Sequence, residues 1–188
     1  MISTNDMRPG QAIMYEGRIV VITDYDRVKP GKGPTFVRAK LKDIATGQVL
    51  DKTWRGEQKV ELIILTGRPH QFMYKQGSEF HFMDLETYDQ ITLNDKQVSE
   101  DMARWLKENM EVLITFHDQT PLKLEIPNFV ELKVTATAPG VRGDTVSGAS
   151  KAATLETGTT VQVPLFINEG DVLRIDTRNG QYVTRAEK

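Results

Sequence analysis

The sequence predicts a mainly β protein built from three small barrels in series. Short apolar runs and alternating apolar and polar residues recur along the chain, and they end at Gly, Pro, Asn or Asp. Only one segment has the spacing of an amphipathic helix. Two stretches with proline, at 66–69 and 127–128, separate three blocks.

The first block, residues 1–65, is predicted to be an SH3-like barrel. Four or five short strands in a segment of this length are typical of such a small barrel. Residues 24–26, Asp-Tyr-Asp, are expected to form a turn at the end of the first apolar run. The expected strands lie at 19–22, 35–41, 48–54 and 59–65.

The second block, residues 66–128, is predicted to be an OB-type barrel. One short helix is expected between its third and fourth strands, with Ser99 or Asp95 as the N-cap. Three strands, a helix and two strands match the five-stranded OB arrangement. The helical spacing is carried by Val98, Met102, Trp105, Leu106 and Met110, and the strands are expected at 71–75, 79–84, 88–93, 111–116 and 121–126.

The third block, residues 129–188, is predicted to be another small barrel of the OB type. A Gly- and Ser-rich stretch at 139–151 is expected to be a loop, and no segment has helical spacing. The strands are expected at 129–137, 159–163, 172–176 and 181–184.

Composition excludes several classes of protein. Of 188 residues, 27% are charged and 39% are hydrophobic, which is a normal globular balance. The absence of cysteine excludes disulfides, thiolate nucleophiles and Cys-ligated metals. The first residues lack the features of a signal peptide, and no apolar run approaches the ~18 residues of a membrane span. We therefore expect a cytoplasmic protein with no membrane partner.

No catalytic constellation is found in the sequence. His70, His81 and His117 lie on or beside different predicted strands and lack metal-ligand spacing. A phosphate-binding P-loop would require glycine and Ser or Thr where this chain has Asp26 and Gly33. The sequence therefore predicts no enzyme activity, no metal and no cofactor.

The net charge of −2 is unevenly distributed. The segment 27–42 contains only basic residues among its charged positions. Such a run fits either a solvated strand face or a surface that binds phosphates, and charge alone leaves both open. Its cations are Arg27, Lys29, Lys32, Arg38, Lys40 and Lys42.

The tip of the predicted hairpin within this run has an unusual composition. Pro30 and Pro34 fix φ on either side, while Gly31 and Gly33 leave room around the long side chain of Lys32. This pattern fits either an ordinary basic hairpin or a lysine that is presented to a partner.

Several motifs resemble the bacterial elongation factor P family. Residues 28–33, VKPGKG, followed by 36–41, FVRAKL, resemble the hairpin of that family's first domain. Residues 151–170 fit the family signature K-x-A-x4-G-x2-[LIV]-x-V-P-x2-[LIV]-x2-G at every fixed position. Further similar segments lie at 127–132, 139–145 and 176–178.

The resemblance implies a fold and a function. It implies an L-shaped monomer with a KOW-type first barrel, which binds the 70S ribosome between the exit and peptidyl sites. It also implies contact with peptidyl-tRNA and rRNA, and relief of stalling at consecutive prolines. Lys32 would lie at the acceptor end of the peptidyl-tRNA, and the basic residues Arg27, Lys29, Arg38, Lys40 and Lys42 would contact RNA phosphates.

The resemblance also assigns residues in the third block. Gly143, Asp144 and Thr145 match the loop that approaches the exit-site codon, while Tyr182 and Arg185 match a tRNA-contact motif. An edge strand with a solvated arginine is the alternative interpretation of the last two residues. Many family members carry an extension on the tip residue, which implies a lysine-modifying enzyme as a further partner for Lys32. Pro34, however, is typical of a branch whose lysine works unmodified.

Two rival functions stay open. The first is a paralogue of the same family with a divergent ribosomal role. The second is a free single-strand RNA-binding protein, in which OB-barrel aromatics would stack on bases. The charge of −5 over residues 66–128 opposes this use of the aromatics there, Phe72, Tyr74, Phe80, Phe82 and Tyr88.

Overall fold

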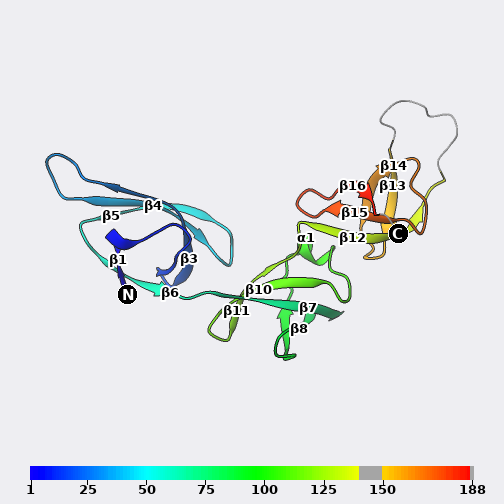
Figure 1. The fold of residues 1–188 in the computed structure, drawn as a ribbon, viewed down its shortest axis with the longest axis horizontal. Helices are drawn as coiled ribbons and strands as arrows, with labels where there is room; N and C mark the ends of the chain where they lie inside the picture. Colours follow the sequence, from blue (N-terminus) through cyan, green and yellow to red (C-terminus); the bar gives the residue numbers. More distant parts are fainter. Residues whose placement is uncertain (140–149, 187–188) are drawn as a thin grey trace. The chain divides into compact units, whose positions relative to one another are not determined.

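The computed structural model describes residues 1–139 and 150–186. Its strands form one six-stranded sheet and two five-stranded sheets, which confirms the predicted mainly β fold (Figure 1). The chain divides into two compact units, Met1–Arg68 with Ile114–Leu124 and Pro69–Leu113 with Glu125–Lys188.

The first sheet has the strand order β1-β6-β2-β3-β4-β5. Its inward residues form a core of Met7, Ile13, Val20, Ile22, Val37, Ala39, Leu41 and Trp54. The sequence did not predict β1 and β2, because two and four residues are too few to show a period. The strands are β1 (Ile2–Ser3), β2 (Ala12–Tyr15), β3 (Arg18–Val28), β4 (Phe36–Asp43), β5 (Val49–Arg55) and β6 (Lys59–Ile63), and a 3₁₀ turn spans Thr4–Asp6.

Strand β3 is longer than the sequence predicted. The expected turn at 24–26 was wrong, since these residues pair with β4 as far as Val28. Tyr25 packs against the first core and donates its hydroxyl to the carbonyl oxygens of Thr4 and Asn5, at 3.3 and 3.0 Å. Pairing and packing therefore override the local turn preference of aspartate.

The second sheet has the order β11-β10-β7-β8-β9, so the five predicted strands are present with shifted ends. The largest shift is at β7, which begins at Thr66. The strands are β7 (Thr66–Gln76), β8 (Glu79–Asp84), β9 (Gln90–Asn94), β10 (Glu111–His117) and β11 (Thr120–Glu125).

The predicted helix exists but is one turn long. Helix α1 spans Glu100–Ala103, with Ser99 at its N-cap, although the Ser99 side chain makes no capping hydrogen bond. Beyond it, the amide of Trp105 donates to the carbonyl of Met102, and Leu106 donates to Ala103, which are i→i−3 bonds of successive turns. The apolar positions of the pattern are nevertheless mostly buried: Val98, Trp105, Leu106 and Met110.

The third sheet has the order β14-β13-β12-β15-β16. The sequence missed β13, which begins inside the expected loop and is rich in alanine, a weak strand former. Among the described residues of this block no helix occurs, as predicted. The strands are β12 (Phe129–Thr137), β13 (Ser150–Leu155), β14 (Thr160–Pro164), β15 (Val172–Asp176) and β16 (Gln181–Arg185).

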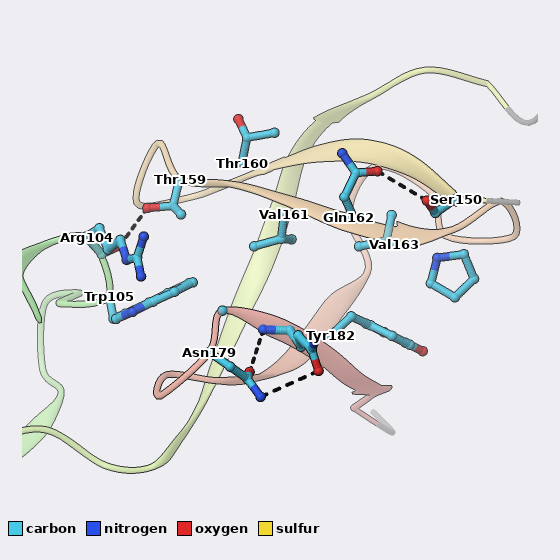
Figure 2. Close-up of a pocket in the computed structure, with 13 residues that line it drawn as sticks. Arg104, Trp105, Ser150, Thr159, Thr160, Val161, Gln162, Val163, Asn179 and Tyr182 are labelled. Carbon is cyan, nitrogen blue, oxygen red and sulfur yellow. Dashed lines mark hydrogen bonds between the residues drawn. The ribbon is translucent and has the colours of Figure 1, made fainter. Parts of the chain in front are cut away.

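Within the second unit, the segment after α1 packs on the third sheet. Trp105 is 1% exposed and lies beside Gly180 in the β15–β16 turn. The hydroxyl of Thr159 donates to the carbonyl of Arg104 at 2.8 Å (Figure 2), and Lys107 Nζ donates to the carbonyl of Glu131 at 2.7 Å. These contacts join the middle and last parts of the chain.

Candidate functional site

The β3–β4 hairpin presents the candidate tip. Val28 and Phe36 form the last strand pair, so residues 29–35 make the connection, which projects from the rest of the first sheet (Figure 1). Pro30 and Pro34 have no amide hydrogen to extend the ladder. Gly33 has φ +125°, a value that favours glycine, whereas a Cβ there would meet only Pro30 Cγ at 3.7 Å. Backbone conformation, not space, therefore requires Gly33.

Lys32 is exposed at the centre of this loop. Among the described residues, no hydrogen bond, ion pair or ring contact involves its side chain. The ammonium is therefore available to a partner, and removing it should cost the fold little. The neighbouring cations Lys29 and Arg27 are exposed as well.

Strand β4 alternates between the core and the surface. Val37, Ala39 and Leu41 are buried, whereas Arg38, Lys40 and Lys42 are exposed. The predicted half-buried strand is thus confirmed, and three of the predicted cations share its outer face.

The sheet places acids beside these cations, which the sequence analysis did not foresee. The segment 27–42 contains no acid, but Asp26 of β3 lies opposite Arg38, and Asp24 lies opposite Lys40. On the other side of β4, Asp51 of β5 also lies opposite Lys40. The basic run is therefore interleaved with carboxylates on its outer face.

Near the tip, the structure adds a cation that the sequence analysis missed. Arg55 of β5 is exposed and lies opposite Phe36, the first residue of β4. The guanidinium of Arg38 lies over the Phe36 ring, 5.1 Å from its centroid. The sequence analysis missed Arg55 because the expected strand ended at residue 54, whereas β5 continues to Arg55 and pairs it with Phe36.

The three histidines have separate structural surroundings. His70 is buried with Nε2 3.8 Å from an Asp84 carboxylate oxygen, and the His81 ring stacks on Tyr74 at 4.5 Å. The Nδ1 atom of His117 lies 3.4 Å from the carbonyl oxygen of Ile64. In residues 1–139 and 150–186, no group of three or more His, Asp or Glu side chains is placed to hold a metal ion.

The aromatics of the second sheet are divided between the core and the surface. Phe72, Phe80 and Phe82 are buried, whereas Tyr74 and Tyr88 are 44% and 69% exposed. A base-stacking platform needs exposed rings. The single-strand RNA-binding interpretation therefore loses three of its five aromatics.

Tyr182 and Arg185 lie together on β16. Tyr182 is partly buried and lines a hollow of about 770 Å³ with Trp105 and Gln162 (Figure 2). Arg185 is 56% exposed, and its Nη1 atom lies 3.9 Å from Asp171 Oδ2. The predicted codon-side residues Gly143, Asp144 and Thr145 fall outside the described residues.

Throughout the described part of the chain, no helix combines the length and the apolar character needed to cross a membrane.

Three family models match the chain in succession. The model described as the elongation factor P KOW-like domain matches residues 3–60, and the elongation factor P OB domain matches residues 65–124. The model of the elongation factor P C-terminal domain matches residues 130–185. The KOW-like and OB descriptions agree with the barrel types predicted for the first two blocks.

Curated relatives match nearly the whole chain. Elongation factor P of Pelotomaculum thermopropionicum is 48% identical over 98% of this chain and 100% of its own length. Elongation factor P of Coprothermobacter proteolyticus is 48% identical over 98% of this chain and 99% of its own.

Solved structures share the fold over part of the chain. Eukaryotic translation initiation factor 5A from Methanococcus jannaschii has a TM-score of 0.51 and 24% identity, and it covers 66% of this chain and 93% of its own. A translation initiation factor 5A family protein from Naegleria fowleri has a TM-score of 0.54 and 14% identity, and it covers 66% of this chain and 96% of its own. At these identities the likeness is one of fold alone.

Proposed function

The chain belongs to the elongation factor P family and is a translation elongation factor, not an enzyme; on this premise we propose that it binds the ribosome beside peptidyl-tRNA. There it stimulates peptide-bond formation and relieves stalling at consecutive prolines. It acts in the cytoplasm as a monomer, with the 70S ribosome, rRNA and peptidyl-tRNA as partners. The observation that carries the proposal is the exposed Lys32 at the tip of the β3–β4 hairpin.

The chemistry of proline explains why a factor is needed. Its ring restricts the backbone, and its nucleophile is a constrained imino group, so the reactive geometry is reached rarely. A lysine placed against the acceptor end of peptidyl-tRNA lowers the entropic barrier by holding the reactants in position, while the ribosome supplies the catalysis. Arg27 and Lys29 beside the tip contact RNA phosphates.

Two further groups of residues complete the proposed interface. Arg38, Lys40 and Lys42 face RNA from β4, and Tyr182 and Arg185 contact tRNA from β16. Gly143, Asp144 and Thr145 approach the exit-site codon. If a lysine-modifying enzyme acts on this protein, Lys32 is its target, and the intact mass of natively purified protein decides whether the lysine is extended.

The proposal is tested with Lys32→Ala. Because the exposed side chain makes no hydrogen bond, ion pair or ring contact with the described residues, the free energy of unfolding should change by less than roughly 0.5 kcal/mol. The rate of synthesis through three consecutive prolines should fall by up to about 100-fold, because positioning errors at a reacting centre are this costly. Lys32→Arg should fail in part, since a planar guanidinium does not replace a compact ammonium.

The measurement is a reconstituted translation assay with two templates, one with the proline run and one without it. Lys59→Ala, which removes an exposed lysine of β6, is the matched control and should behave as wild type. A Lys32→Ala protein that translates the proline run at the wild-type rate would remove the proposed role of the tip.

A further inference from the structure

The outer face of strands β3, β4 and β5 carries an alternating pattern of charge. We call it the β4 face and define it by Asp24, Asp26, Arg38, Lys40, Asp51 and Thr53, which line a shallow hollow of about 360 Å³ with Ala39 and Lys52. Within this set, three carboxylates stand beside two cations, Arg38 and Lys40. Neighbouring carboxylates weaken the attraction of these two cations for RNA phosphates.

A β-bulge creates this pattern. Ile22 lies opposite Leu41 and faces the core, while Asp24 lies opposite Lys40 on the outer face, so Thr23 is the extra residue. Without the bulge, the period of two would turn Asp24 and Asp26 to the same side as Ile22. The Thr23 hydroxyl donates to the carbonyl of Lys40 at 3.2 Å, and the Tyr25 amide donates to Asp24 Oδ1 at 2.9 Å. The bulge and its hydrogen bonds therefore place both aspartates beside Arg38 and Lys40.

Each cation of the β4 face has a carboxylate directly opposite it on a neighbouring strand. Arg38 has Asp26 directly opposite on one side and neutral Thr53 on the other. Lys40 has Asp24 on one side and Asp51 on the other. Residues directly opposite in an antiparallel pair have Cβ atoms about 5 Å apart, so their charges interact. Among the described residues, none of these neighbours closes to an ion pair within 4.0 Å, so the cations stay open to solvent.

The tip differs from the β4 face in its charge. Lys32 and Lys29 lie in the connecting loop, and Arg27 lies opposite the apolar Val37, so none of the three has a carboxylate as its strand partner. A phosphate near Lys29, Lys32 or Arg27 meets a cation with no carboxylate opposite it on the paired strand, whereas a phosphate near Arg38 or Lys40 meets a cation that has one. The two surfaces should therefore discriminate between RNA that reaches the tip and RNA that does not.

We propose that Asp24, Asp26 and Asp51 are specificity-determining residues of the hairpin, which prevent the β4 face from binding RNA unless the RNA also engages the tip. Repulsion of wrong partners is a general route to specificity, because it lowers the affinity for competitors more than for the intended complex. This inference rests on the proposed RNA-contacting function of the hairpin. With this discrimination, free RNA in the cell does not occupy the β4 face, and the protein remains available to bind the ribosome.

The test is the triple variant Asp24→Asn, Asp26→Asn, Asp51→Asn. Asparagine keeps the side-chain oxygen that accepts from the Tyr25 amide, so the hairpin should fold as before. Affinity for free tRNA at 50 mM salt should rise between about 3-fold and 100-fold, the range expected for two or three opposite-charge pairs. The slope of log affinity against log salt should steepen by about 1 for each cation released to phosphate.

Affinity for ribosomes that hold peptidyl-tRNA should rise less than affinity for free tRNA, so the ratio of the two affinities should fall. The matched control is Glu57→Gln, Glu61→Gln, Asp95→Asn, which changes the net charge equally at exposed positions off the β4 face. An equal gain by the control would assign the effect to net charge and overturn the proposal, as would unchanged binding of free tRNA by the triple variant.

The single variant Asp51→Asn lies on the edge strand β5 and guards against misfolding of the triple. Its affinity for free tRNA should rise by a smaller but measurable factor than that of the triple variant. A folded Asp51→Asn whose affinity for free tRNA does not rise would also count against the proposal. These outcomes are distinct from failure of the proposed function, which is judged by Lys32→Ala and synthesis through consecutive prolines. Loss of that activity in Lys32→Ala without any change in the aspartate variants would refute the specificity role alone.

Discussion

Gly180 illustrates how one residue connects a turn to the packing of the second unit. It has φ +71°, and a Cβ built there would lie 3.4 Å from Trp105 Cζ2 and 3.7 Å from Cη2. These are ordinary contact distances, so the first carbon of a side chain would fit but atoms beyond it would press on the indole. Gly47 has nearly the same φ, +74°, with nothing within 4 Å of its Cβ position.

The pair Gly180→Asn and Gly47→Asn separates backbone strain from crowding. Asparagine tolerates the left-handed region, so Gly47→Asn should lower the free energy of unfolding by less than about 1 kcal/mol. Gly180→Asn should cost about 1–3 kcal/mol more, the usual cost of overpacking a filled site. Urea unfolding followed by Trp fluorescence measures both variants, and equal losses would show that Trp105 does not restrict position 180.

Single residues also mark the limit of sequence prediction at the site. The prolines and glycines around Lys32 act on their own backbone, so their pattern predicts the tip directly. The partners of Arg38 and Lys40 depend on the bulge at Thr23 and on the β4–β5 register. Register is set by packing across strands, so the acids beside the basic run could not be predicted from the run itself.

At the scale of elements, one turn is built three times. The turns that begin at Asp43, Asp84 and Asp176 each have the aspartate carbonyl accepting from the amide four residues later. That later residue has positive φ in each case: Gly47, Tyr88 and Gly180. In each turn the aspartate side chain also accepts from the amide two residues later, at 2.8 to 3.0 Å. The aspartates thus end one strand and set the start of the next.

Two of these aspartates, Asp43 and Asp176, link the fold to pH. Burial raises the pKa of Asp43, but hydrogen bonds from Thr46 and Ala45 and the nearby Arg18 outweigh it, so the pKa lies below its ordinary value. The side-chain hydrogen bond from Arg178 likewise lowers the pKa of Asp176. A depressed pKa in the folded state contributes stability above the unfolded value, near 3.9, and this stability is lost as the pH falls through the folded pKa.

Asp43→Asn tests this contribution. Asparagine retains the acceptor for the Ala45 and Thr46 amides but loses the charge, so the melting temperature at pH 7 should fall. Below the unfolded pKa, near 3.9, the contribution of the charge is progressively lost, so the difference between variant and wild type should shrink as the pH falls toward 2.5. Asp95→Asn, an exposed turn position, should show no such convergence. A difference that stays constant between pH 7 and pH 2.5 would contradict the role of the Asp43 charge.

Elements were predicted where their own residues carry the period. Strand β4 alternates cleanly between core and surface and was predicted almost to its ends. Strand β13 has weak strand formers, and pairing with β12 and β14 determines it. Four of the five apolar positions in the helical spacing from Val98 to Met110 are buried, all but Met102, because a series of turns buries them as well as a helix does.

For the molecule as a whole, the distribution of charge decides where RNA can bind. Residues 1–65 carry eleven basic and eight acidic side chains, whereas residues 66–128 carry six and eleven. A chain with a net charge of −2 therefore concentrates its basic residues in the block that contains the tip. Since phosphate contacts release counterions, the salt dependence of ribosome binding reports how many of these cations meet RNA.

Two double variants compare the tip with the β4 face at equal change in net charge. Arg27→Gln with Lys29→Gln removes two cations that have no carboxylate as strand partner, and the salt slope of ribosome binding should flatten by about 1 for each phosphate that the variant no longer neutralises. Arg38→Gln with Lys40→Gln removes cations that Asp24, Asp26 and Asp51 already offset, so its slope should flatten less. Binding is measured between 50 and 200 mM salt, a range over which several phosphate contacts change affinity by orders of magnitude. Equal flattening by the two variants would mean that the carboxylates do not screen β4, and no flattening by either would remove the hairpin from the electrostatic interface.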